Sequence, residues 1–131
     1  MIPDRLDDGT RIAQVLASEL TGDRDDLAQL SVTDADPDVE PTPDGALAYR
    51  VVHDAGDTKT TIAEVFVQPD RVRVEFVVAV DDAAQAADAA GLRVRPKAVR
   101  PPRTLVFVEN GAQVKWILPT FETVAGLVDR R

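Results

Sequence analysis

Residues 59–80 read Lys-Thr-Thr-Ile-Ala-Glu-Val-Phe-Val-Gln-Pro-Asp-Arg-Val-Arg-Val-Glu-Phe-Val-Val-Ala-Val, and this stretch decides the fold. In its second half, apolar residues occupy every other position from Val72 to Val80, and charged residues alternate with them over 71–75. Successive side chains of a strand point to opposite faces of a sheet, so this pattern predicts a half-buried strand. The Pro69-Asp70 pair predicts a tight turn. The stretch is therefore expected to form two adjacent antiparallel strands.

A carboxylate interrupts the apolar pattern of the first of these strands. Glu64 shares one face with Ile62 and Phe66. Burial of an ionised carboxylate costs free energy unless the charge is paired. We therefore expect Glu64 to lie near a sheet edge, to pair with a cation, or to have a chemical role.

The flanking segments predict three helices. Ile12, Leu16 and Leu20 recur at helical spacing after Asp7 or Asp8, either of which can cap the helix. An alanine-rich helix is expected over residues 83–90, with Asp81-Asp82 as its cap. Thr120 is expected to cap a third helix, whose apolar face is formed by Phe121, Val124, Leu127 and Val128.

Further strands are expected on both sides of the central pair. A weak edge strand is expected at 27–33 and a clear strand at 47–53. Segments 105–109 and 112–118 are expected to form a hairpin, because Asn110-Gly111 between them is a strong two-residue turn signal. The chain of 131 residues is expected to be a single domain over 1–131.

This order, α-(β)-β-β-β-α-β-β-α, predicts an α+β fold: an antiparallel sheet, made of a meander plus a C-terminal hairpin, with about three helices packed on it. The order and the acidic charge resemble the type III secretion chaperone-like fold, which includes the YbjN-like proteins. The resemblance implies a homodimer that binds another protein. No motif carries it, so it assigns no functional residue.

The composition is acidic and unusual. Acidic residues outnumber basic ones by 23 to 15, with 17 Asp against 6 Glu and 12 Arg against 3 Lys. This balance resembles small cytoplasmic proteins of halophilic archaea; a GC-rich mesophile is the alternative source. No apolar run is long enough to span a membrane and no signal peptide pattern is present, so we expect a cytoplasmic protein. The chain has no cysteine, which excludes disulfides and thiolate-ligated metals.

Two proline-rich segments stand apart from the predicted elements. Residues 34–45 carry three prolines and five acids. Their alternating carboxylates resemble the start of a calcium loop, but Pro37 interrupts them and Gly45 stands where a bidentate Glu is needed. We expect a solvated acidic loop there. Residues 93–103 are basic and contain no acid, whereas the rest of the chain carries ten bases against 23 acids, a net −13.

The basic segment is the best candidate for a partner or anion site. Its cations are Arg93, Arg95, Lys97, Arg100 and Arg103, and its prolines are expected to keep it extended and out of the sheet interior. Three roles are open: docking against acidic surface of this chain or of a second subunit, binding of another acidic protein, and binding of nucleic acid. Arginine binds phosphate bidentately, which suits the last role.

Catalytic signals are weak. His53 is the only histidine and stands next to Asp54, an arrangement typical of a general base but also of a surface histidine in an acidic chain. Glu64, Asp70 and Glu75 lack the lysine that metal-dependent nuclease sites place two residues after the acid. The glycines are scattered, so no phosphate-binding loop is present. The sequence therefore favours a non-enzymatic protein without catalytic residues, metal or cofactor.

The functional hypothesis is a non-enzymatic protein-interaction module of a halophile, dimeric and chaperone-like or adaptor-like. The alternative is a nucleic-acid-associated protein that uses residues 93–103. A homo-oligomer or a protein partner is expected, nucleic acid is the second partner class, and no membrane contact is expected.

Overall fold

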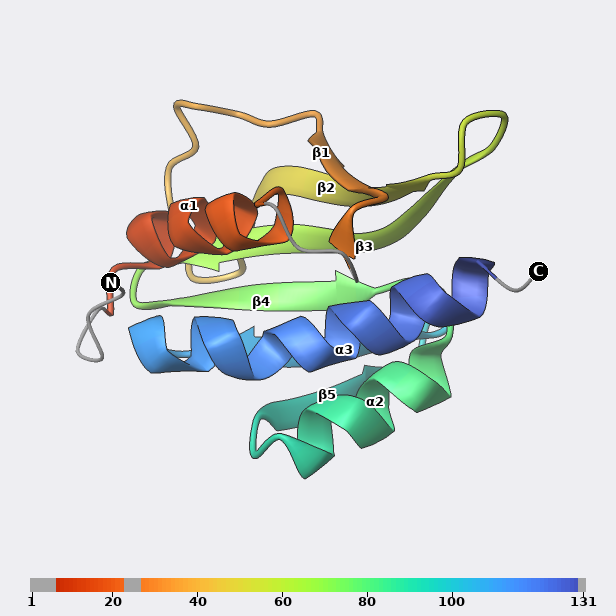
Figure 1. Cartoon of the computed structure of the whole chain (residues 1–131). Helices are drawn as coiled ribbons and strands as arrows, with labels where there is room; N and C mark the ends of the chain where they lie inside the picture. The colour runs from red at the N-terminus through yellow and green to blue at the C-terminus, as the bar shows by residue number, and fades with distance from the viewer. Residues whose placement is uncertain (1–6, 23–26, 130–131) are drawn as a thin grey trace.

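The chain forms two layers, a six-stranded antiparallel sheet and three helices that all lie on one face of it (Figure 1). The coordinates are a computed structural model that describes residues 7–22 and 27–129. The α+β class and the element order are confirmed. The elements are α1 (Gly9–Leu20), β1 (Leu30–Thr33), β2 (Ala46–Asp54), β3 (Lys59–Gln68), β4 (Arg71–Phe76), α2 (Val80–Ala89), β5 (Arg93–Lys97), β6 (Arg103–Val108) and α3 (Gly111–Asp129).

The sheet has the strand order β1-β2-β3-β4-β6-β5, so the central stretch supplies its two middle strands. β3 and β4 pair across the Pro69-Asp70 turn, as the sequence predicted. β4 ends earlier than expected, at Phe76, and Val80 opens α2. The reason is local: Ala79 has a left-handed backbone with φ 48°, and the Thr104 hydroxyl donates a hydrogen bond to the Val80 carbonyl at 2.7 Å.

The core lies between the sheet and the helices. Val72, Val74 and Phe76 are fully buried and face the helix layer, as their alternation predicted. α1 contributes Ile12, Leu16 and Leu20, and Asp8 caps it by accepting a hydrogen bond from the Arg11 amide. The Phe76 and Phe121 rings meet with their centroids 5.0 Å apart, which joins the middle of the sheet to α3.

The prediction of a strand over 112–118 is wrong, because these residues form the first two turns of α3. Asn110 is the helix cap and not a hairpin turn: its side chain accepts from the Gln113 amide at 3.1 Å, and the Gln113 side chain accepts from the Glu109 amide at 2.8 Å. Thr120 is likewise buried within the helix instead of capping it. Helical spacing of the buried residues explains the outcome: Val114, Ile117, Leu118 and Phe121.

The missing strand is supplied by the basic segment. Residues Arg93–Lys97 form β5, the edge strand beside β6, and the two make the C-terminal hairpin. Pro96 lies in this edge strand, where its missing N–H costs least. The expectation that residues 93–103 stay out of the sheet interior therefore holds for β5 but not for Arg103, which begins the inner strand β6.

The predicted cap of α2 is also wrong. The helix begins at Val80, so Asp81 and Asp82 lie in its first turn and make no capping hydrogen bond; Ala79 is the capping residue. Carboxylates in the first turn still favour the helix through its dipole. Gly91 follows the helix with φ 86°, a conformation that suits glycine.

Gly9 provides a test of how α1 is seated on the sheet. A Cβ atom there would lie 1.9 Å from the Gln68 carbonyl oxygen and 2.8 Å from that of Arg71. The Gly9→Ala variant should lower the free energy of unfolding by about 2–3 kcal/mol, because backbone must move to admit the methyl group. Denaturant unfolding at fixed salt measures the change.

Gly126→Ala is the matched control. Gly126 lies inside α3 and a Cβ there meets nothing within 4 Å. This change should raise the free energy of unfolding by about 0.5–1 kcal/mol through helix propensity. Equal effects of the two variants would contradict the close seating of α1.

Candidate functional site

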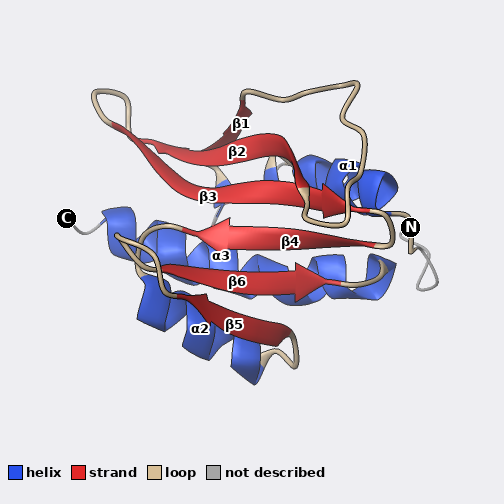
Figure 2. Ribbon diagram, turned by 180° about the vertical axis from the view of Figure 1, so that it is seen from behind, coloured by secondary structure: helices blue, strands red, loops and turns tan. Residues whose placement is uncertain are grey.

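One face of the sheet carries no helix. In Figure 2 the strands lie in front and all three helices lie behind them. Residues opposite each other in an antiparallel register share a face, so the register identifies the side chains of this uncovered side. We call it the open face. It is built from the residues that alternate with the buried core positions of β2, β3, β4, β5 and β6.

Two rows of side chains cross the open face. The first row has a charged residue on four of the six strands. Strand by strand, it runs through Thr33, Arg50, Glu64, Glu75, Leu105 and Arg95. The second alternates apolar and basic residues: Leu47, Phe66, Arg73, Phe107 and Arg93. Two further pairs of the open face lie outside these rows: Lys97–Arg103 on β5 and β6, and Gln68–Arg71 on β3 and β4.

Glu64 and Glu75 lie directly opposite each other on β3 and β4, and Arg103 joins them. The same guanidinium nitrogen of Arg103 is 2.6 Å from Glu64 Oε1 and 3.0 Å from Glu75 Oε1. Arg50 binds the second oxygen of Glu64 at 2.7 Å, and Arg73 binds the second oxygen of Glu75 at 2.8 Å. The paired alternative for Glu64 is therefore the one that the structure shows.

This network fixes the ionisation of both carboxylates. Burial opposes ionisation of Glu64, but hydrogen bonds from Arg50 and Arg103 outweigh it and hold the pKa of Glu64 below its usual range. Burial also opposes ionisation of Glu75, whose side chain is 0% exposed, and hydrogen bonds from Arg103 and Arg73 again leave its pKa lowered. Both groups are negative at neutral pH and are neutralised by cations of the same face.

Guanidinium groups lie over both aromatic rings of the two rows. The Arg73 guanidinium lies 4.6 Å from the centroid of the Phe66 ring, and that of Arg71 lies 5.1 Å from the centroid of Phe107. These are cation–π distances. Arg73 also donates to the Asp44 carbonyl oxygen at 2.7 Å, so the acidic loop is tied to the edge of this face.

The structure separates the five predicted cations into two groups. Three have acidic neighbours: Lys97 contacts Glu75 at 3.4 Å, Arg103 binds Glu64 and Glu75, and Arg93 lies 3.8 Å from Glu109. Within the described ranges, Arg95 and Arg100 are exposed and have no ion pair. Intramolecular docking thus accounts for part of the basic segment only.

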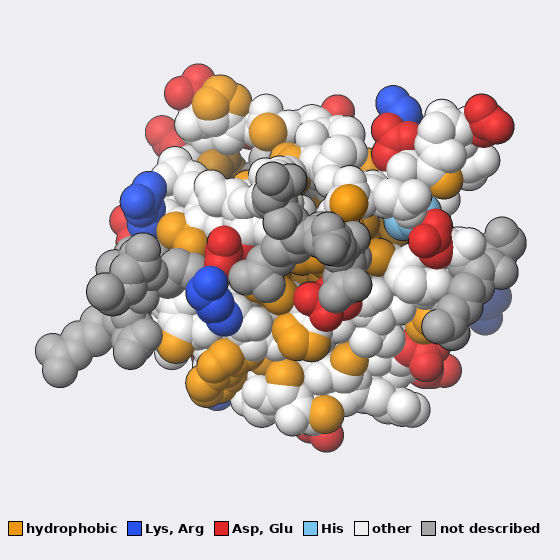
Figure 3. Space-filling model, viewed as in Figure 1, with side chains coloured by type: hydrophobic (Ala, Val, Ile, Leu, Met, Phe, Trp, Pro, Cys, Tyr) orange, Lys and Arg blue, Asp and Glu red, His pale blue; other side chains and the backbone are white. Residues whose placement is uncertain are grey.

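Sequence reasoning missed three cations of the same face, namely Arg50, Arg71 and Arg73. Alternation predicts that Arg71 and Arg73 lie on the outer side of their strand, but nothing in the sequence links them to residues 93–103, because strand order cannot be derived from the chain order alone. Arg100 lies in the loop between β5 and β6 and is not part of the open face. The described strands therefore bring seven cations together around the carboxylates Glu64 and Glu75: Arg50, Arg71, Arg73, Arg93, Arg95, Lys97 and Arg103. Lys and Arg side chains are sparse on the opposite, helix-covered side (Figure 3).

The candidate catalytic residues do not come together. His53 does not pair with Asp54, whose side chain accepts from the Gly56 amide; it lies instead 3.3 Å from Asp129 of α3. Asp70 lies in the β3–β4 turn, so it is not part of the Glu64–Glu75 pair. In the described ranges, no three His, Asp or Glu side chains could hold a metal ion. What the open face can do chemically is to present fixed guanidinium groups to an anionic surface.

Replacement of Glu75 tests the network. Glu75→Gln should lower the free energy of unfolding by about 1–3 kcal/mol, because Arg73, Arg103 and Lys97 lose a charged acceptor in a buried setting. Glu109→Gln is the matched control and should cost about 0.5 kcal/mol or less, because its pairs are longer and partly exposed. Urea unfolding measures the free energy of unfolding of both variants. An equal decrease in the two would contradict the stabilising role of the ion pairs at Glu75.

Acid should weaken the same network. The pKa values of Glu64 and Glu75 are lower in the native chain than the value of about 4.3 in an unfolded one. Their contribution to stability is therefore complete above that pH and is lost as the pH falls through the native pKa values. Glu75→Gln should flatten this loss in a series of unfolding curves between neutral and acidic pH. If Glu75→Gln leaves the pH dependence of stability unchanged, the lowered pKa of Glu75 does not contribute to it.

Comparisons with known proteins identify a family and nothing more specific. No curated protein matches the chain, and no solved structure matches it. Over the described residues, no helix has both the length and the apolar character needed to cross a membrane. One family model matches all of residues 1–131, and its description is a family of unknown function, DUF7993. The chain therefore belongs to this family of unknown function.

Proposed function

We propose that this protein is a non-enzymatic interaction module that docks an acidic partner protein on the open face of its sheet. The observation that carries the proposal is the segregation of charge: a chain of net charge −8 gathers seven cations on one uncovered face. The chaperone-like or adaptor-like role that the fold resemblance implies is consistent with such a surface. Docking needs no catalytic group.

The composition of the open face resembles that of a protein interface. Arginine and aromatic residues are enriched at the centres of interfaces, whereas lysine is depleted. Six of the seven cations here are arginines, and they alternate with the half-buried Phe66 and Leu105 and the buried Phe107. The hydrogen bonds to Glu64 and Glu75 hold several guanidinium groups in place, so less side-chain entropy is lost on docking.

We also propose a halophilic setting, on the Asp-rich and Lys-poor composition. The Debye length falls to about 3 Å near 1 M salt. Long-range attraction is then screened, and direct arginine–carboxylate hydrogen bonds with apolar contacts must supply the affinity. This favours a protein partner over nucleic acid, whose binding weakens steeply with salt.

Dimerisation, if it accompanies this function, uses a different surface. A two-fold interface places the same patch of both subunits against itself. On the open face that arrangement would bring two cation-rich surfaces together. The expected homodimer therefore stays a prediction, and the helix layer is the surface that is left for it.

A paired set of charge reversals tests the docking surface. Arg95→Glu reverses one exposed cation of the open face that has no ion pair within the described chain, so the fold should be retained. The matched control is Arg11→Glu, which makes the same charge change at an exposed position of α1, on the helix side of the sheet. A partner recovered from the native host at its own salt should bind the first variant about tenfold more weakly, or about 1.4 kcal/mol, and the control as it binds the parent.

The outcomes separate the alternatives. If nuclease treatment abolishes recovery of the partner, the seven cations bind nucleic acid, which is the alternative function. Equal affinity of the two variants for a nuclease-resistant partner would show that docking does not use the open face.

A further inference from the structure

A buried imidazole lies on the opposite side of the sheet from the open face. His53 is near the end of β2 and faces the helix layer, and its side chain is 3% exposed. Its Nε2 atom lies 3.3 Å from Asp129 Oδ1 but forms no hydrogen bond within the described chain. Buried polar atoms are normally hydrogen-bonded, so an exception needs an explanation.

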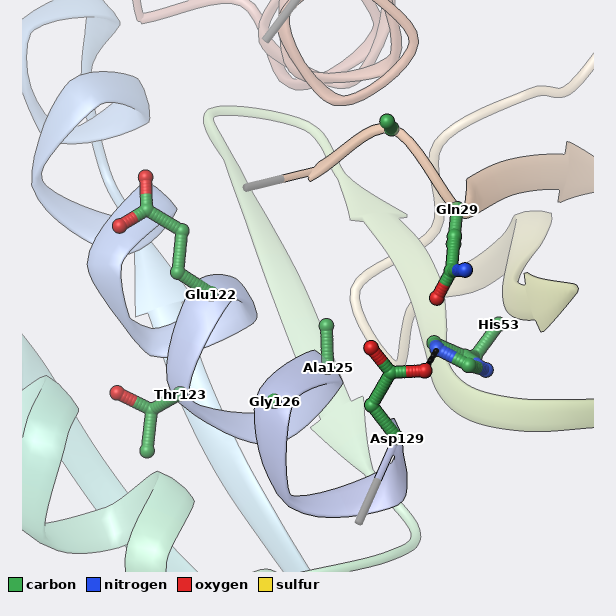
Figure 4. A pocket seen from close by; sticks show the side chains of 8 residues that line it. Gln29, His53, Glu122, Thr123, Ala125, Gly126 and Asp129 are labelled. Carbon is green, nitrogen blue, oxygen red and sulfur yellow. Dashed lines mark ion pairs between the residues drawn. The ribbon is translucent and has the colours of Figure 1, made fainter. Parts of the chain in front are cut away.

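The His53 imidazole adjoins a cavity of about 610 Å³. That volume lies within the usual range of small-molecule sites. Figure 4 shows the side chains of Gln29, His53 and Asp129 close together at one end, whereas Glu122 and Thr123 lie two turns away along α3. The described lining is Ala28, Gln29, His53, Glu122, Thr123, Ala125, Gly126 and Asp129.

The lining favours a cation. Glu122 and Asp129 are seven residues apart on α3, so they share a helix face about 10 Å apart along the axis. The described lining contains no Lys or Arg. Asp129 ends α3, where free carbonyl groups and the helix dipole also favour positive charge. A neutral imidazole Nε2 accepts a hydrogen bond from an ammonium group.

We propose that this cavity binds an elongated organic cation with amino groups at both ends, of the polyamine class. One ammonium group donates to Asp129 and to Nε2 of His53, and the other pairs with Glu122. A metal ion fits less well, because the described residues contain no group of three ligating side chains. The inference is independent of the proposed docking function, because the cavity and the open face lie on opposite sides of the sheet.

The single histidine gives a direct readout. The chain has one His, so its imidazole resonances in a ¹⁵N-histidine-labelled sample need no assignment. Spermidine at one fixed salt concentration should shift them saturably, and its uncharged diol counterpart should not. Asp129→Asn should weaken the spermidine response about tenfold, through loss of a charge-assisted hydrogen bond. Asp81→Asn, at an exposed position on α2, is the matched control and should leave the response unchanged.

A second comparison tests the two-ended geometry. Glu122→Gln should weaken spermidine binding and leave the weaker binding of butylamine, a monoamine, unaffected. Calorimetric titration of the parent chain gives the same ranking without any variant, so a variant that fails to fold does not decide the question. An equal response to spermidine, butylamine and matched added salt would overturn the proposal, as would an equal response of Asp129→Asn and Asp81→Asn.

Discussion

The bridge from Arg103 to Glu64 and Glu75 is the interaction on which the open face depends. Two carboxylates stand side by side on the middle strands of the sheet, at a spacing where like charges repel. Arg103 comes from β6 and neutralises both, while Arg50 and Arg73 satisfy the outer oxygens. Strand β6, which lies far from β3 and β4 in the chain, is thereby joined to both of them on the side where no helix packs.

Different interactions stabilise the two faces of the sheet. On the helix side, valine and phenylalanine side chains are buried against α1 and α3, and burial of apolar surface is the driving force. On the other side, ion pairs and guanidinium–aromatic contacts replace a second layer. This division lets one face serve stability while the other presents charge, and it explains how Glu75 becomes inaccessible to solvent on a face without a helix.

Much of the fold could be predicted from periodicity, and the errors occur where two signals compete. The alternation from Val72 to Phe76 was enough to predict β4, because strict apolar–polar alternation is typical of a half-buried strand. Asn110-Gly111 suits a hairpin turn and a helix start equally well, and the helical spacing from Val114 to Phe121 was the better guide. The candidate site was predictable in part only. The pairing of Glu64 with a cation was one of three expectations, but Arg50 and Arg103 are 14 and 39 residues away from it, and only strand order places them beside it.

Pro96 has a consequence for self-association. It lies in β5, an outermost strand, where it removes one backbone donor from the free margin, and Arg93 and Arg95 add like charges beside it. The opposite margin is β1, a strand of only 4 residues. Short, charged or proline-bearing margins resist growth of a sheet by strand addition. Copies of this chain are therefore poor templates for ribbon-like fibres, even at salt concentrations that screen the repulsion between acidic molecules.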